Sequence, residues 1–258
     1  MNPAFKKQGF FMDQGSLFTI FSTFYSLKCP MKRTLIFITL AVLLCGHVYA
    51  QDWAQLEKFR SANQTLKETM KEEGRVVFFG NSITIGWLHT MPSFFEGKPY
   101  VNRGIGGQTT PQMLVRFRQD VIDLHPQVVV ILAGTNDIAG NIGPMTLEET
   151  LGNLISMTEL ARANGIAVVL SSVLPASDYP WRPGLRPDLK IPQLNAMIRE
   201  YAKEAGVVYL DYFSAMVNEE QGLDPELARD GVHPTAKGYE VMAPLAESAI
   251  REALSNKE

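Results

Sequence analysis

The stretch that most constrains the fold is Gln127-Val-Val-Val-Ile-Leu-Ala133, in which an unbroken apolar run follows Gln127. A continuous β-branched run of this kind has no polar face, so it predicts a strand that is buried on both sides. Such strands lie inside parallel sheets, where helices cover both faces. The run stops at a polar turn, Gly134-Thr-Asn-Asp137. We therefore expect a parallel sheet with a central strand that ends in polar side chains.

Shorter apolar runs and amphipathic segments alternate along the rest of the chain. The predicted strands are residues 76–79, 100–102, 127–133, 166–170 and 207–211. The predicted helices are residues 53–73, 111–124, 146–164, 191–205 and 236–254, the last bent at Pro244. No linker or repeat divides residues 51–258. This order predicts one α/β domain of three layers, with a five-stranded parallel sheet and right-handed crossovers. We expect the aromatic segment Trp87–Phe95 to form a rim or lid.

The first 50 residues have the pattern of an N-terminal extension and a secretory signal peptide. A basic start at Met31-Lys-Arg33 precedes an apolar run, residues 35–44, and a small-residue cleavage site, Val48-Tyr-Ala50. We take Met31 as the translation start and expect a mature, exported domain at residues 51–258. The apolar run is too short to predict a stable membrane span in the mature chain. We expect a periplasmic or secreted protein.

The charge and the cysteine content limit which molecules and metal ions the mature chain can bind. The chain has 24 basic and 27 acidic residues, of which five basic residues and one acidic residue lie in residues 1–50. Residues 51–258 therefore have 19 basic and 26 acidic residues, a net charge of −7. This charge disfavours nucleic acid and anionic membrane surfaces as partners. Both cysteines, Cys29 and Cys45, fall in the leader, so the mature chain has no disulfide and no thiolate metal ligand. A lipoprotein anchored through Cys45 is the alternative, although the bulky Leu44 before that cysteine disfavours it.

Polar side chains follow the carboxyl ends of several predicted strands. In a parallel sheet these ends lie together at one edge. Ser82 follows the first strand in the sequence Gly80-Asn-Ser82, which suits a strand–turn–helix junction. A serine at this place is either a helix cap or a nucleophile. As a nucleophile it needs a base, and the base needs an orienting group.

The mature chain has three histidines that can serve as that base. His125 is expected on the surface at the opposite edge, and His89 in the rim segment. Only His233 has a carboxylate three residues before it in a turn, Asp230, which can hold the imidazole tautomer. The alternative interpretation of Asp230-Gly-Val-His-Pro234 is a turn before a helix. Oxyanion donors are available from the Ser82 N–H, a glycine of residues 104–107 and the Asn136 amide.

Four blocks of this sequence resemble those of the SGNH hydrolases, also called GDSL-type esterases. The blocks are Gly80-Asn-Ser-Ile-Thr84, Gly104-Ile-Gly-Gly-Gln-Thr109, Gly134-Thr-Asn-Asp137 and Asp230-Gly-Val-His233. The resemblance covers residues 75–250 in order and spacing. It implies the flavodoxin-like SGNH fold, a Ser82–His233–Asp230 triad and an oxyanion hole of Ser82, Gly107 and Asn136. It implies no metal and no cofactor.

Two details of these blocks concern the branch of the family that the chain resembles and the residue before the expected nucleophile. Residues 102–110, Asn-Arg-Gly-Ile-Gly-Gly-Gln-Thr-Thr, are especially similar to the branch of platelet-activating-factor acetylhydrolase. The family commonly has Asp before the nucleophile, where this chain has Asn81. Asn81 can still cap the helix, and we count it with the substrate-binding residues.

We expect an exported serine esterase that acts on short-chain, acetyl-like esters of carbohydrate. The proline-rich loop Pro175–Pro192 follows the fourth strand, and in it Trp181 and Tyr179 can stack on a sugar while Arg182 and Asp178 bind its polar groups. A rigid surface loop without a substrate role is the alternative. Three other functions remain open: a lysophospholipase or lipase, a catalytically silent sugar-binding module, and flavodoxin-like cofactor binding. The last lacks an acidic ribose partner.

Overall fold

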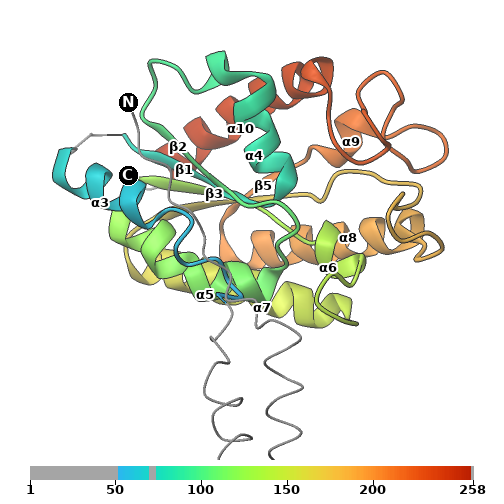
Figure 1. Cartoon of the computed structure of the whole chain (residues 1–258), viewed down its shortest axis with the longest axis horizontal. Coiled ribbons are helices and arrows are strands. Elements are labelled where there is room, and N and C mark those ends of the chain that lie inside the picture. The colour runs from blue at the N-terminus through green and yellow to red at the C-terminus, as the bar shows by residue number, and fades with distance from the viewer. Residues whose placement is uncertain (1–51, 70–73, 257–258) are drawn as a thin grey trace, which may run out of the picture. The chain divides into compact units, whose positions relative to one another are not determined.

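The structure is a computed structural model that describes residues 52–69 and 74–256. The signal peptide, the start at Met31 and the lipidation alternative at Cys45 lie outside these residues. Asp52–Glu258 form one compact unit. Figure 1 shows its layers, with helices above and below a central sheet.

The predicted five-stranded parallel sheet is confirmed, and its order is β2-β1-β3-β4-β5. The strands are β1 (Val76–Gly80), β2 (Tyr100–Gly104), β3 (Val128–Leu132), β4 (Ala167–Ser171) and β5 (Val208–Leu210). β3 is buried at every position and pairs with both β1 and β4, as its unbroken apolar run requires. The chain leaves β1 toward β2 on one side and returns to β3 on the other. This reversal makes β1 and β3 the switch point of the sheet, where open α/β folds bind ligands.

Helices cover both faces of the sheet. The helices are α3 (Arg60–Thr69), α4 (Ser82–Thr90), α5 (Thr110–Asp120), α6 (Thr135–Ile138), α7 (Leu147–Ala163), α8 (Pro187–Ala205), α9 (Phe213–Met216) and α10 (Ala236–Ser255). Short 3₁₀ turns are η1 (Pro92–Phe94) and η2 (Ile122–Leu124). α4 and α10 lie on one face, and α5, α7 and α8 on the other (Figure 1). Each face has its own apolar core, because alternate strand residues point to opposite sides.

Several boundaries differ from those predicted. The first helix begins only at Arg60, because the Asp52 carboxylate accepts the Leu56 and Glu57 N–H groups and holds a turn instead. α8 begins at Pro187, four residues before the predicted start, since proline suits the first helical turn. Pro192 consequently stands inside that helix.

The aromatic segment expected as a rim or lid is part of the core, so that prediction was wrong. Trp87 is buried at the end of α4 and stacks on Phe94 at 4.3 Å between ring centroids and on Tyr239 of α10 at 5.4 Å. Phe95 is also buried and meets Phe78 of β1 edge to face. The segment therefore joins α4 to the sheet and to α10, and it does not cover the ligand edge.

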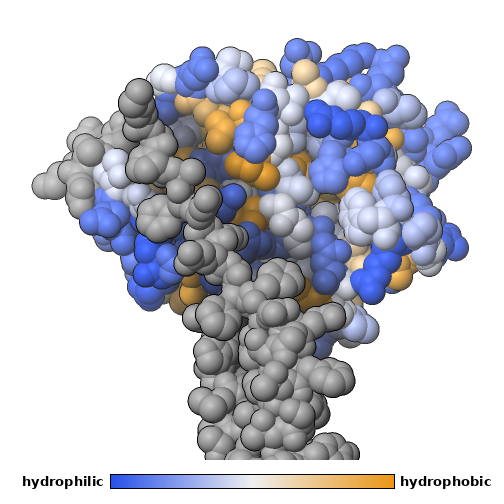
Figure 2. All heavy atoms as spheres, in the orientation of Figure 1, coloured by the Kyte–Doolittle hydropathy of each residue, from blue (hydrophilic) through white to orange (hydrophobic). Residues whose placement is uncertain are grey.

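Within the described residues, no helix has the length and apolarity needed to cross a membrane. On the face of the molecule that Figure 2 shows, hydrophilic residues prevail and apolar residues lie in small separate areas.

Candidate active site

The turn after β1 holds Ser82 at the first position of α4. Asn81 is the N-cap, and its side-chain oxygen accepts the Ile83 N–H at 3.0 Å. Gly80 allows α4 to leave the strand at once: a Cβ there would lie 2.1 Å from the Thr84 hydroxyl. On the other side, a Cβ on Gly104 of β2 would lie 2.3 Å from the Ile85 nitrogen. Two glycines thus let two strand ends close around the first turn of α4 and keep Ser82 at the sheet edge.

The structure brings the Ser82, His233 and Asp230 side chains into one hydrogen-bonded chain. His233 Nε2 lies 2.9 Å from Ser82 Oγ, although 151 residues separate them in sequence. His233 Nδ1 lies 2.8 Å from Asp230 Oδ2. With the Nδ1 proton on the carboxylate side, Nε2 is free to accept the serine proton. His89 and His125 are both exposed and belong to other parts of the fold.

The Asp230 carboxylate is fixed by its own turn. Its Oδ1 accepts the backbone N–H groups of Val232 and His233 at 3.1 and 2.8 Å. Partial burial by itself would raise the pKa of Asp230, but these N–H groups and the His233 ring lower it below its ordinary value. The carboxylate therefore stays ionised at neutral pH. The His233 and Asp230 side chains are 31% and 40% exposed, so the chain of groups opens to solvent.

The turn after β2 and the turn after β3 meet beside Ser82. Gly107 has a left-handed backbone, with φ at +75°. Asn136, in α6, donates from Nδ2 to the Gln108 carbonyl at 2.9 Å. Asn141 donates from its own Nδ2 to Asn136 Oδ1 and to the Gly107 carbonyl, both at 3.1 Å. The two predicted oxyanion residues, Gly107 and Asn136, are thus joined through Asn141.

Asn141 is a site residue that the sequence analysis missed. It lies five residues after Asn136, in the turn segment that follows α6, where it forms an isolated bridge with Gly143. An asparagine next to a glycine is common turn chemistry, so its sequence context carried no signal of a link to Asn136.

The loop between β4 and α8 lies against the same edge. Trp181 is 44% exposed, stacks on the Tyr179 ring at 5.2 Å, and has its ring centre 6.1 Å from that of His233. Tyr179 is buried, and its hydroxyl accepts a hydrogen bond from Thr135 at 3.0 Å. Trp181 is therefore the aromatic side chain of this loop that a ligand can reach, and Tyr179 supports it from below.

Three residues expected to contact substrate bind the protein itself, although Arg182 and Asp178 remain exposed to solvent. Arg182 donates from Nη1 to the Ala139 and Gly140 carbonyls, which end α6. Asp178 accepts the Tyr179 and Gly184 N–H groups within its loop. Asn81 is fully buried as the cap of α4. The structure thus gives Arg182 and Asp178 a role in anchoring the loop, and Asn81 a role as a cap out of reach of a ligand.

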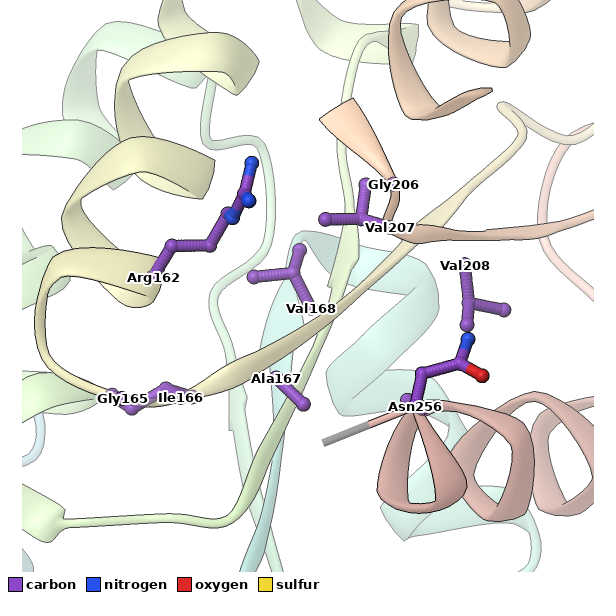
Figure 3. Close-up of a pocket in the computed structure, with 10 residues that line it drawn as sticks. Arg162, Gly165, Ile166, Ala167, Val168, Gly206, Val207, Val208 and Asn256 are labelled. Atoms are coloured by element: carbon purple, nitrogen blue, oxygen red, sulfur yellow. The ribbon is translucent and has the colours of Figure 1, made fainter. Parts of the chain in front are cut away.

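A separate hollow lies away from these residues. It has a volume of about 250 Å³ and is formed at the opposite ends of β4 and β5, where Arg162 and Asn256 border it (Figure 3). Backbone and apolar side chains make up most of its lining, and it holds none of the predicted site residues. In the described part of the chain, no group of three or more histidine, cysteine or acidic side chains could hold a metal ion.

Comparison with known proteins identifies the family of this chain. Residues 78–241 match the GDSL-like Lipase/Acylhydrolase family, and this range contains all four blocks. The chain belongs to this family. The solved structure of a GDSL-like lipase from Bacteroides thetaiotaomicron is similar, with 48% sequence identity and a TM-score of 0.75 over 78% of this chain and 99% of that one.

Two curated relatives of this GDSL-family chain cover less of it. An uncharacterized lipoprotein of Bacillus subtilis is 32% identical over 40% of this chain and 51% of its own length. An acetylxylan esterase of Xylanibacter ruminicola is 24% identical over 69% of this chain and 43% of its own length. The chain thus spans about half the length of the curated relatives that it matches.

Proposed function

We propose that this protein is an exported serine esterase that removes short acyl groups, acetyl above all, from carbohydrate esters. The hydrogen-bonded chain from Ser82 through His233 to Asp230 is the observation that carries the proposal. A serine that only caps a helix needs no imidazole at its hydroxyl, and here Asn81 makes the cap.

In the proposed acylation step, His233 Nε2 takes the proton of Ser82 as Oγ attacks the ester carbonyl carbon. Asp230 stabilises the imidazolium that forms and holds its orientation. When the tetrahedral intermediate collapses, the bond to the alcohol oxygen breaks and His233 gives its proton to that oxygen. Water then attacks the acyl-enzyme by the same route, releasing the acid and restoring Ser82.

The negative charge of the intermediate requires donors that are already in place. We assign this role to the N–H groups of Ser82 and Gly107 and to the Asn136 amide. An amide nitrogen carries two hydrogens, and the bond to the Gln108 carbonyl uses one of them. The second can bind the oxyanion, while Asn141 prevents the amide from rotating.

The carbohydrate part of the proposal rests on Trp181. Its exposed ring is next to His233, backed by Tyr179, and offers a flat apolar surface for a sugar beside the scissile ester. The name of the Xylanibacter ruminicola relative, an acetylxylan esterase, agrees with this substrate class. A long acyl chain would need an apolar cleft to bury its methylenes, each worth about 0.8 kcal/mol. The aromatic segment that could have supplied one packs into the core instead.

The export part of the proposal rests on residues 31–50, whose basic start, apolar run and small-residue cleavage site are typical of a signal peptide. Secretion and periplasmic location both fit this pattern. Fractionation of cells that express the full chain, with mass spectrometry of the mature N-terminus, tests it. We expect a start at Gln51, and a mature protein that retains residues 31–50 contradicts export by this signal.

Covalent labelling tests the chemistry directly. A fluorophosphonate should label the wild-type protein at Ser82 and leave the Ser82→Ala protein unlabelled. p-Nitrophenyl acetate, butyrate and octanoate then compare acyl lengths, followed by acetylated xylan. We expect acetate to be hydrolysed with the highest kcat/KM. Absence of labelling contradicts the esterase, and a preference for octanoate or lysophospholipid supports a lipase instead.

A further inference from the structure

A fully buried arginine lies beneath the turn that carries Ser82. Arg116 stands in the middle of α5, between Met113 and Phe117, and its side chain has no exposure to solvent. A charge at such a place is strongly destabilising unless it is paired and hydrogen-bonded. Its partners therefore decide why the helix keeps a charge on its buried face.

The guanidinium of Arg116 makes four contacts in different directions. Nη2 donates to the Gly80 carbonyl at 3.0 Å, and Nε donates to Gln108 Oε1 at 2.5 Å. Nη1 pairs with Asp120 at 3.0 Å. The plane also lies over the Phe79 ring, 4.1 Å from its centre.

Two of these partners belong to the turns that form the candidate site. Gly80 lies two residues before Ser82, and its carbonyl also accepts the Ile105 N–H at 3.0 Å. Gln108 follows Gly107 directly, and its carbonyl accepts the Asn136 amide at 2.9 Å. One guanidinium thus ties the end of β1 to the turn after β2 and, through Gln108, to Asn136.

We propose that Arg116 is a positioning residue that sets the placement of Ser82 relative to Gly107 and Asn136. It acts through Gly80 and Gln108 and does not reach the reacting atoms. This inference rests on the proposed function, since it gives Arg116 a purpose in esterase catalysis. A planar fork with donors in fixed directions suits two acceptors on two separate turns, which a lysine ammonium cannot serve in the same way.

The charge of Arg116 is neutralised by an acidic residue of its own helix, one turn further along α5. Asp120 pairs with it, and Asp120 Oδ1 accepts Asn63 Nδ2 of α3 at 2.6 Å. Burial lowers the pKa of Arg116 to about 10, against the opposing effect of Asp120, so the fork stays charged at neutral pH. Arg103, the other nearby cation, bonds to Asn63 and to the Asn102 carbonyl. The pair with Asp120 also makes outright removal of Arg116 a poor test, because it strands a buried carboxylate.

The first test is therefore the variant Arg116→Lys, which keeps a positive charge to pair with Asp120 and loses the planar guanidinium that contacts Gly80 and Gln108. kcat and KM for p-nitrophenyl acetate are measured at a temperature where circular dichroism shows the variant folded. We expect kcat to fall about 10- to 100-fold with KM within twofold, since displacements near 1 Å cost catalysis on this scale. The pH of half-maximal activity should stay unchanged, because His233 and Asp230 are untouched.

A second variant serves in case Arg116→Lys does not fold. Gln108→Met preserves side-chain size and the Arg116–Asp120 pair while removing the acceptor of Nε, and we expect kcat to fall about 3- to 10-fold at constant KM. Met157→Ala is the matched control: it leaves a cavity beneath α7, where Met157 is fully buried, lowers the melting temperature, and should retain wild-type kcat.

Each result separates the two proposals. If the wild-type protein is not labelled by fluorophosphonate, the esterase and the role of Arg116 fall together. If the wild-type protein is labelled and turns over, but Arg116→Lys and Gln108→Met keep wild-type kcat, only the positioning role is overturned. A loss of activity that follows the folded fraction, in these variants as in Met157→Ala, overturns it as well.

Discussion

Replacing Asn136 by alanine removes the one side-chain donor that we assign to the oxyanion. The residue is almost fully buried, and its amide is fixed between the Gln108 carbonyl and Asn141. Removing such a donor costs roughly 2.7–4 kcal/mol of transition-state stabilisation, so kcat should fall about 100- to 1000-fold. KM should change little, because the oxyanion exists only after attack.

A double-mutant cycle with Asn141 sharpens the test. Asn141→Ala deletes one neutral hydrogen bond to Asn136, worth about 0.5–1.5 kcal/mol, or roughly 2- to 10-fold in kcat. Once Asn136 is alanine, Asn141 has no amide to hold, so most of that loss should disappear. Asn164→Ala, which removes a hydrogen bond at the end of α7 far from the site, is the control.

The assay is steady-state hydrolysis of p-nitrophenyl acetate by the wild type, the two single variants, the double variant and the control, with thermal melts of each. A rise in KM without a fall in kcat refutes the oxyanion role and makes Asn136 a ground-state contact. An equal loss on Asn141→Ala in both backgrounds refutes the coupling and leaves Asn141 acting through the Gly107 carbonyl.

Four further outcomes are expected. Ser82→Ala should lower activity by about 10⁴-fold or more without changing the circular dichroism spectrum, and ordinary turnover by this folded variant contradicts the mechanism. Activity should be lower in acid than at neutral pH, because His233 must be neutral to take the serine proton, and a flat profile from about pH 5 to 8 counts against this role. The lowered pKa of Asp230 adds stability that is present above about pH 4 and lost as pH falls through the lowered value, which acid titration of unfolding in wild type and Asp230→Asn can measure. Trp181→Ala should raise KM for acetylated xylo-oligosaccharides by roughly tenfold, about 1.4 kcal/mol, and leave p-nitrophenyl acetate unaffected; equal effects on both substrates argue against a sugar platform.

Local patterns were enough for the sheet and for the polar groups at its edge. The β-branched run at residues 127–133 has one low-energy environment, a strand with both faces covered, and β3 has this environment. Parallel strands bring their carboxyl ends to the same edge, so the turns after β1, β2 and β3 could be placed together without coordinates. The helix predicted over residues 146–164 starts where expected for a similar local reason, because Thr146 caps α7 and forms a capping box with Glu149.

Loop packing could not be predicted in this way. Arg182 and Asp178 are polar residues in a polar loop, and whether they face a ligand or the protein depends on where α6 lies. The apolar character of the segment from Trp87 to Phe95 suits a lid and a core equally well. It belongs to the core because Trp87 stacks on Tyr239 of the last helix. These outcomes depend on partners distant in sequence.

Arg116 shows the same division most clearly. Its spacing from Asp120, four residues along α5 on the face of Met113 and Phe117, is visible in the sequence as a charged pair on an apolar face. That pattern alone indicates an ion pair within one helix. Its contacts with the Gly80 carbonyl and Gln108 exist because α5 packs under the ends of β1 and β2.

By itself, the sequence determined the chemistry available at the sheet edge: a serine after β1, a glycine turn after β2, an amide after β3, and a histidine three residues beyond a carboxylate. It did so because each of these depends on residue type and on neighbours within a few positions. Only the tertiary structure decided that Ser82 and His233 lie 2.9 Å apart across 151 residues, and that Trp181 lies beside them. The physical reason is that these distances follow from how α10 and the loop after β4 pack on the sheet, which no local pattern encodes.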